Sequence, residues 1–249
     1  MLQNKSKTAE TNLLVSIKDF SEISDELINL VNIIDLKDPS RGSIGSWKLS
    51  EIRKVIKLYK SKIIISATLG DIFDNKRFLN KLEKFDELNL DFIKFGLLSH
   101  NCNSLYDKIK LISLKKYKTD LVCVIFVDKD EKLKKTKNKI SHIKDYGINH
   151  ILLDTFVKIN GDIFDFCDIE DIEDFIYLCK EYKIKTGIAG GLKEYQIPSI
   201  INLSPDIIGF RSAVCENRSR TGMIQKKKLK KISSYFRVFN NKAIDNAGA

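Results

Sequence analysis

The stretch Val31-Asn32-Ile33-Ile34-Asp35-Leu36-Lys37 shows the pattern that decides the fold of this chain. It is a short apolar run, rich in β-branched residues, and a polar loop, Asp38 to Ser43, follows it. Such a run predicts a buried strand. The pattern recurs along the chain, and segments of helical length, with apolar residues three and four positions apart, separate the runs.

Eight runs of this kind are predicted as strands. They are Leu13–Ile17, Ile33–Lys37, Ile63–Leu69, Phe92–Leu97, Leu121–Val127, His150–Thr155, Thr186–Ala189 and Ile207–Phe210. Eight strand–helix alternations favour an α/β fold, a (β/α)8 TIM barrel in a single domain. A doubly wound open sheet is the alternative, but no GxGxxG motif follows the first run, as a dinucleotide-binding version would require. We expect the barrel at residues 12–236, a flexible N-terminus at 1–11 and a flexible C-terminal tail at 237–249.

Composition narrows the class of protein. With 249 residues, 43% of them hydrophobic, the chain can bury one large core. No apolar stretch reaches the roughly 18 residues that span a bilayer, and the polar first residues lack a signal peptide, so we expect a cytoplasmic protein that binds no membrane. The five cysteines are scattered, which disfavours a zinc site or a disulfide framework.

The net charge of +10 suggests an anionic partner, yet only seven of the 43 basic residues are arginines and the lysines are dispersed. We therefore predict no nucleic-acid binding, because neither a basic face with interleaved aromatic residues nor a known module is visible. A homo-oligomer is compatible with the sequence.

Three lysines stand at or near the ends of apolar runs, where an unpaired charge costs several kcal/mol. Lys37 ends the second run, Lys94 interrupts the fourth, and Lys158 follows the sixth. Asp35 shares a strand face with Lys37, and Asp154 lies in the sixth run. In a barrel these strand ends form the catalytic face, and an amine of lowered pKa can form an imine with a carbonyl. The pattern predicts lysine-based catalysis; a structural ring of ion pairs is the alternative.

The last two strands are followed by small and basic residues that fit a phosphate. Gly190 and Gly191 follow the seventh run, and Arg211 and Ser212 follow the eighth. Loops at these positions of the barrel commonly bind phosphate through backbone N–H groups. A second phosphate could be held by Ser40 and Arg41 after the second run, although these residues also fit a simple turn.

Six segments spread over residues 12–236 match one known family. They are Leu14-Val15-Ser16, Ile34 to Ser43, Ser66 to Asp71, Phe92 to Leu97, Leu153-Asp154-Thr155 and Gly209 to Cys215. Together they resemble (5-formylfuran-3-yl)methyl phosphate synthase, the furan-forming enzyme family of methanofuran biosynthesis. The block Asp-Leu-Lys-Asp-Pro-Ser-Arg-Gly-Ser at 35–43 is the most specific part.

The resemblance implies a (β/α)8 lyase that condenses two molecules of glyceraldehyde 3-phosphate, a triose phosphate. The implied product is 4-(hydroxymethyl)-2-furancarboxaldehyde phosphate, formed with loss of phosphate and water and without a metal or organic cofactor. Carried onto this chain, Lys37 matches the Schiff-base lysine and Lys94 the proton-transferring lysine. Asp35, Asp154 and Lys158 match supporting positions.

One departure and two alternatives remain at this point. Gly191 stands where the family tends to have a serine, which removes a hydroxyl from the expected phosphate site. A class I aldolase acting on another sugar phosphate would use a barrel lysine in the same way, but it would form no furan. A binding protein that kept the barrel and lost catalysis is disfavoured, because the lysines and aspartates are all present.

Overall fold

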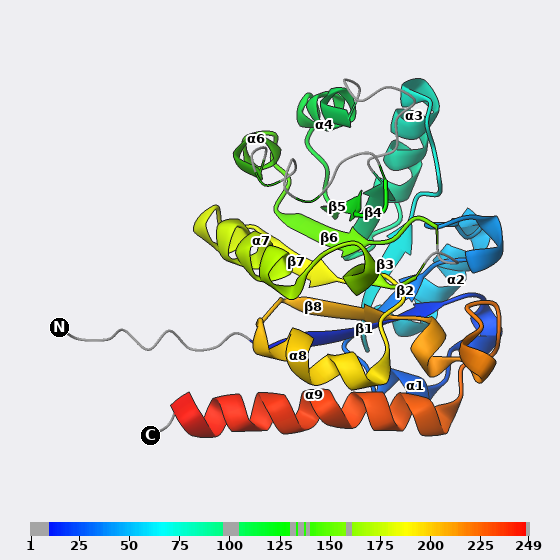
Figure 1. Ribbon diagram of the computed structural model, residues 1–249. Helices are drawn as coiled ribbons and strands as arrows, with labels where there is room; N and C mark the ends of the chain where they lie inside the picture. Colours follow the sequence, from blue (N-terminus) through cyan, green and yellow to red (C-terminus); the bar gives the residue numbers. More distant parts are fainter. Residues whose placement is uncertain are drawn as a thin grey trace.

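The computed structural model describes residues 10–96, 105–129, 133, 137, 140–157 and 161–247, and its eight parallel strands close into a barrel in chain order (Figure 1). The strands are β1 (Asn12–Ile17), β2 (Ile33–Leu36), β3 (Ile64–Thr68), β4 (Phe92–Gly96), β5 (Asp120–Phe126), β6 (His150–Asp154), β7 (Lys185–Ile188) and β8 (Ile207–Phe210). Each strand overlaps the run that predicted it. The expected (β/α)8 TIM barrel is therefore confirmed.

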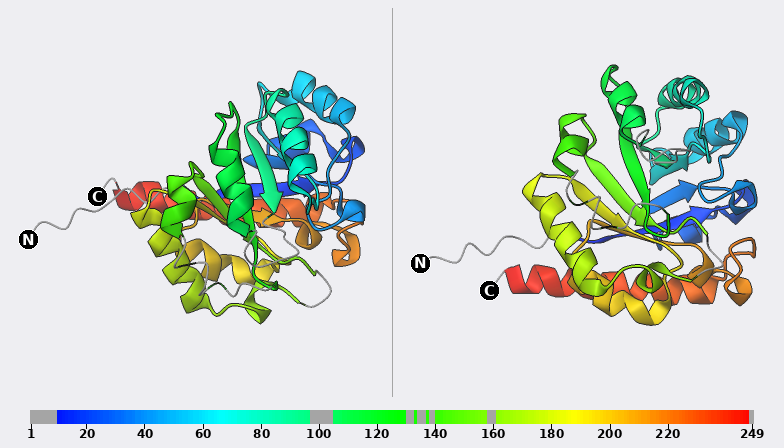
Figure 2. Two further views of the ribbon diagram at one scale, coloured as in Figure 1. Left: turned by 90° about the horizontal axis from the view of Figure 1, so that it is seen from above. Right: turned by 45° about the horizontal axis from the view of Figure 1, so that its top comes forward.

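Helices surround the ring of strands (Figure 2). They are α1 (Asp25–Ile28), α2 (Leu49–Tyr59), α3 (Asn75–Asp86), α4 (Leu105–Ser113), α6 (Ile140–Asp145), α7 (Ile169–Glu181), α8 (Ile197–Asn202) and α9 (Lys226–Ala247). Local sequence sets several of their starts. At α1, for example, the side chain of Ser24 accepts a hydrogen bond from the Leu27 N–H. At α3 the side chain of Asp74 accepts one from the Arg77 N–H in the same way.

The C-terminal segment differs from its prediction. α9 continues to Ala247, so most of the segment expected to be a flexible tail is helical. Leu229, Ile232 and Phe236 are buried, and Phe239 packs on the same core, because the helical spacing of apolar residues continues past residue 236. At the other end, the buried Thr11 donates a hydrogen bond to the Pro205 carbonyl at 2.8 Å. Residues 1–9 lie outside the described part of the chain.

The core has two parts. The larger one lies between the strands and the surrounding helices. A smaller cluster fills the barrel interior, where Val122, Val124 and Phe126 alternate along β5 and meet Leu152 of β6 and Ile44 of the β2 loop. Residues two apart on a strand share a face, so the other barrel strands also present alternate residues inward.

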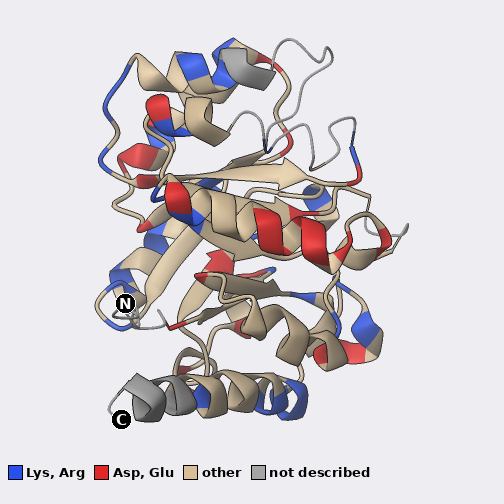
Figure 3. Cartoon of the chain, turned by 60° about the vertical axis from the view of Figure 1, so that its left-hand side comes forward, with Lys and Arg blue, Asp and Glu red and all other residues tan. Residues whose placement is uncertain are grey.

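The outer surface carries both signs of charge, with acidic residues along α7 and basic residues in the first turns of α9 (Figure 3). Several lysines there are paired, as in the contacts of Lys226 and Lys230 with Glu26 at 2.6 and 2.9 Å. Among the described residues, no helix is long and apolar enough to cross a bilayer.

Candidate active site

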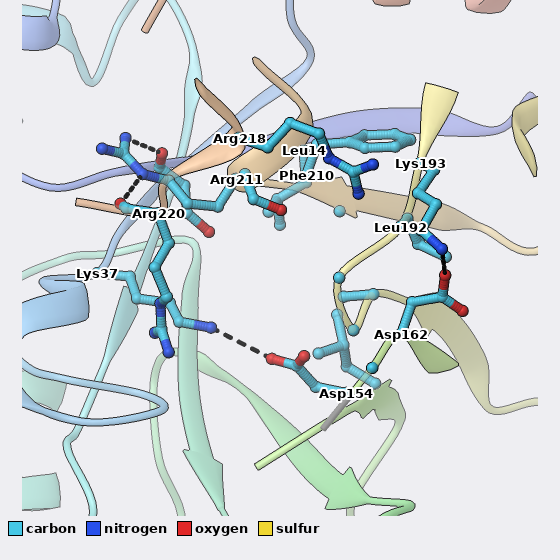
Figure 4. Close-up of a pocket in the computed structure, with 18 of the residues that line it drawn as sticks. Leu14, Lys37, Asp154, Asp162, Leu192, Lys193, Phe210, Arg211, Arg218 and Arg220 are labelled. Carbon is cyan, nitrogen blue, oxygen red and sulfur yellow. Dashed lines mark hydrogen bonds and ion pairs between the residues drawn. The ribbon is translucent and has the colours of Figure 1, made fainter. Parts of the chain in front are cut away.

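A cavity of about 690 Å³ lies at the carboxyl ends of the strands (Figure 4). Seven of the residues predicted for the site line it: Lys37, Lys94, Asp154, Gly190, Gly191, Arg211 and Ser212. The side chains come from β2, β4, β6, β7 and β8 or the loops that follow them, which is the face on which barrel enzymes carry out catalysis.

Lys94 and Asp35 form the deeper of two lysine–carboxylate pairs. Lys94 Nζ lies 2.6 Å from Asp35 Oδ2, and the same oxygen accepts a hydrogen bond from Ser16 Oγ at 3.0 Å. Asp35 is fully buried, and its Oδ1 has no partner among the described residues. Burial lowers the pKa of Lys94, Asp35 opposes this shift, and the nearby charge of Lys37 adds to it.

Lys37 and Asp154 form the second pair across the barrel mouth. Lys37 Nζ lies 3.2 Å from Asp154 Oδ2, and the other carboxylate oxygen accepts the Thr155 N–H at 2.8 Å. Asp35 and Lys37 share a strand face, as expected, but each carboxylate pairs with a lysine from a different strand. The two pairs place two amines in one cavity, where one can attack a carbonyl while the other moves protons.

The loop after β6, which precedes Lys158, is anchored on both sides. Asp128 accepts the backbone N–H groups of Phe156 and Val157 at 2.5 and 2.6 Å, and Ser43 Oγ donates to the Phe156 carbonyl at 2.5 Å. Lys158 itself lies outside the described residues, so its predicted supporting role stays a prediction.

The predicted glycine pair has the backbone geometry that requires glycine. Gly190 and Gly191 have φ values of +102° and +70°, which side-chain-bearing residues rarely adopt. A Cβ on Gly191 would lie 3.3 Å from Asp162 Cα. Nearby, Asp162 accepts hydrogen bonds from Lys193 Nζ and Gln196 Nε2, both at 2.9 Å. Because of its positive φ and the nearby Asp162, position 191 would hold a serine only with backbone strain.

Ser40 and Arg41 do not line the cavity. They lie in the 3-10 helix Pro39–Arg41, where both contact Asp38: Ser40 Oγ at 2.6 Å from Oδ1 and Arg41 Nε at 3.0 Å from Oδ2. The Arg41 side chain is half exposed. The structure thus favours the interpretation of Ser40 and Arg41 as part of a turn over a second phosphate site.

The structure corrects the predicted phosphate contact of Arg211. Its Nη1 and Nη2 lie 2.6 and 3.0 Å from the two carboxylate oxygens of the buried Glu22. Its remaining N–H groups donate to the carbonyl oxygens of Ser16, Arg220 and Gly222. Because a guanidinium has five N–H donors and all five are used, Arg211 holds the loop together and has none left for a phosphate.

Sequence reasoning missed several residues that line the cavity, namely Ser16, Asp162, Lys193, Arg218 and Arg220. A signal for the two arginines was present, since two of the seven arginines stand two residues apart in the loop after the last strand. Arg218 is exposed, whereas Arg220 is partly buried.

A (β/α)8 barrel with buried lysine–carboxylate pairs at its catalytic end defines the class: a barrel enzyme. Comparison with known proteins identifies the family within this class. The model of the 4-HFC-P synthase family matches residues 13–233, and the chain belongs to this family. The resemblance found in six segments of the sequence is confirmed.

Relatives in the family are similar over almost their whole length. A protein of Methanosarcina mazei named (5-formylfuran-3-yl)methyl phosphate synthase is 31% identical over 228 residues, which cover 86% of this chain and 94% of the relative. A protein of the same name from Methanobrevibacter smithii is 28% identical over 225 residues, covering 85% and 93%.

Solved structures share the fold at low sequence identity. 3-Hexulose-6-phosphate synthase superposes with a TM-score of 0.61 at 15% identity, covering 90% of this chain and 99% of that one. The BexX/CysO complex of Amycolatopsis orientalis contains a chain with a TM-score of 0.64 at 12% identity, covering 98% and 95%. At these identities the likeness shows the barrel alone.

Proposed function

We propose that this enzyme is a lyase that condenses two molecules of glyceraldehyde 3-phosphate into 4-(hydroxymethyl)-2-furancarboxaldehyde phosphate, with loss of phosphate and water, in methanofuran-type cofactor biosynthesis. One observation carries the proposal. Lys37 and Lys94 reach a single cavity from two strands, and each is held by its own buried carboxylate. The names of the relatives support the choice of product.

In this proposal Lys37 is the nucleophile. Its amine adds to the aldehyde carbon of one triose phosphate, water leaves, and the resulting iminium withdraws electrons from the adjacent carbon. Asp154, 3.2 Å from Lys37 Nζ, accepts and returns the protons of these steps and balances the iminium charge. Such an imine is the electron sink that both carbon–carbon bond formation and phosphate elimination require.

Lys94 is proposed to move protons at the carbon next to the imine. Because burial lowers the pKa of Lys94, a larger neutral fraction of its amine is available as a base at ordinary pH. Asp35 keeps the side chain oriented and stabilises the ammonium once it has formed. Ring closure and dehydration complete the furan, with Lys158 as a further proposed proton donor.

The test uses purified protein and glyceraldehyde 3-phosphate. A furan aldehyde absorbs strongly in the near ultraviolet, so product formation is followed by absorbance and confirmed by mass. Borohydride added during turnover should fix the imine and add mass to the peptide that contains Lys37. Trapping without furan formation would indicate a class I aldolase instead, and the absence of both would refute the proposed chemistry.

A further inference from the structure

Two arginines in the loop after β8 differ in how fully their guanidinium groups are used. Arg211 donates all five of its N–H groups to protein acceptors. Arg220 donates one, from Nη2 to the Gly42 carbonyl at 3.1 Å, and has no other side-chain hydrogen bond among the described residues. Because Arg220 lines the cavity and most of its N–H donors have no protein acceptor among the described residues, an anion in the cavity would be a favourable partner for its guanidinium.

Arg211 fixes the loop that carries Arg220. Its Nε donates to the Arg220 carbonyl at 2.7 Å and its Nη2 to the Gly222 carbonyl at 2.8 Å, while Glu22 holds the rest of the guanidinium. One arginine therefore serves as the anchor and orients the other. This arrangement holds Arg220 in place before any ligand binds, which lowers the entropy lost on binding.

The position of Arg220 relates it to Lys37. Its side chain bonds to Gly42, in the loop that begins directly after Lys37, and both residues line the cavity. Figure 4 shows Arg220 descending from the β8 loop on the side of Lys37, whereas Arg218 and Lys193 lie toward the other side, near Leu192. Asp154, the partner of Lys37, acts electrostatically on Arg220 and opposes the lowering of the Arg220 pKa by burial.

We propose that Arg220 binds the phosphate of the triose that forms the imine with Lys37, and that it stabilises this phosphate as it leaves. The inference rests on the proposed function. A guanidinium offers paired donors that match two phosphate oxygens. The glycine loop after β7, with Arg218 and Lys193, then serves the phosphate of the second triose.

The step balances without a further reactant. Loss of a proton from the carbon next to the iminium gives an enamine. The nitrogen electron pair then re-forms the carbon–nitrogen double bond, the double bond shifts by one carbon, and the carbon–oxygen bond to phosphate breaks with its electron pair on the phosphate oxygen. Arg220 would neutralise the charge that grows on that oxygen, as preorganised donors do in other active sites.

The experiment compares imine trapping with two aldehydes. Arg220→Gln should trap glyceraldehyde 3-phosphate about ten- to a hundredfold less efficiently than the wild type, as expected for the loss of one charge-assisted contact. Unphosphorylated glyceraldehyde should be trapped equally by both proteins. Inorganic phosphate, titrated calorimetrically, should bind the variant correspondingly more weakly, and Arg220→Lys should be intermediate because it keeps the charge but loses the paired donors.

The matched control is Arg237→Gln, because Arg237 also donates one Nη2 hydrogen bond to a backbone carbonyl, that of Asn29 at 3.0 Å, but on an exposed part of the molecule. It should behave as the wild type in every assay. If Arg220→Gln traps the phosphorylated aldehyde and binds phosphate as the wild type does, the inference is wrong. If the wild type traps neither aldehyde, the imine proposal fails, and the phosphate titration still decides the role of Arg220.

Discussion

Two buried ion pairs at the catalytic end of the barrel differ in how completely they are satisfied. Arg211 and Glu22 form a closed set, because every N–H group of the arginine has an acceptor and both carboxylate oxygens have donors. Lys94 and Asp35 form an open set, in which Asp35 Oδ1 has no partner and Lys94 has one bonded oxygen among the described residues. Similar burial thus accompanies different degrees of hydrogen bonding.

The difference separates scaffold from chemistry. Burial of a charge costs free energy that only a complete set of hydrogen bonds offsets, so the closed pair contributes to holding the loop after β8. The open pair keeps part of that cost, which lowers the pKa of Lys94, and Lys94 lines the cavity, where its amine can meet a substrate. Burial alone did not distinguish the two cases, whereas hydrogen-bond saturation does.

The largest effect is expected at Lys37. Lys37→Arg keeps a positive charge opposite Asp154, but a guanidinium stays protonated and is a poor nucleophile. Turnover should fall by more than about a thousandfold, the order found when a covalent nucleophile is removed. Furan absorbance measures the loss, and borohydride should no longer label this peptide. A label that appears on Lys94 in the wild type would reverse the assigned roles.

Lys94→Arg tests the open pair itself. If Lys94 transfers protons, furan formation should fall by about 10²–10⁴-fold, the usual contribution of general acid–base catalysis. Imine formation at Lys37 should persist, because that amine and Asp154 are untouched. Near-wild-type turnover would leave Lys94 as a charge-balancing residue, since arginine preserves the charge.

The pH dependence follows from the same residue. Because burial lowers the pKa of Lys94, its neutral, basic form becomes populated below the pH at which an ordinary lysine titrates. The wild-type rate should therefore rise with pH through this lowered pKa. In Lys94→Arg the residual rate should lack this limb, because the guanidinium does not titrate in that range. An identical limb in both proteins would assign it to another group.

Disruption of the closed pair of Arg211 and Glu22 should lower the stability of the fold. Arg211→Met leaves the buried Glu22 without its partner and should lower the free energy of unfolding by about 3–5 kcal/mol. Arg41→Ala removes a half-exposed pair with Asp38 and should cost only about 0.2–1 kcal/mol. Urea denaturation measures both. An Arg211→Met protein of unchanged stability would contradict the anchoring role assigned to this pair.

The strands could be predicted from sequence because each is buried on both faces and therefore reads as a short apolar run. The observed ends agree with the predicted runs to within about one residue. The end of the chain could not be placed as well. Its apolar residues keep a helical spacing past residue 236, as at Phe236 and Phe239, but the small and polar residues at 240–249 predicted a frayed end, and the continuation of α9 to Ala247 became evident only in the structure.

The candidate catalytic residues could also be found from sequence, because a charged residue inside an apolar run is conspicuous. The sequence did not show which carboxylate pairs with which lysine. Asp35 and Lys37 are two residues apart, yet their partners, Lys94 and Asp154, come from other strands, and only closure of the barrel brings them together. For Arg211, position in the loop after β8 suggested a ligand contact. Glu22, almost two hundred residues away in the chain, determines otherwise.

The smallest effect, and the sharpest contrast, is expected from two serines beside Asp35. Ser16 on β1 and Ser66 on β3 both lie opposite Asp35 in the strand register and are both buried, but only Ser16 Oγ donates to the carboxylate. Ser66 Oγ has no partner among the described residues. The two hydroxyls therefore differ mainly in whether they help to satisfy the open pair.

Ser16→Ala should lower the free energy of unfolding by roughly 1.5–3 kcal/mol, as for other hydrogen bonds to charged groups, and turnover by less than about tenfold, because Asp35 still holds Lys94. Ser66→Ala should leave stability unchanged or raise it slightly, since it removes a buried hydroxyl that makes no hydrogen bond. Denaturation and furan absorbance on both variants decide the matter. Equal losses in the two proteins would mean that Ser66 also acts on Asp35 or on the substrate, and that the open pair is less open than its hydrogen bonds indicate.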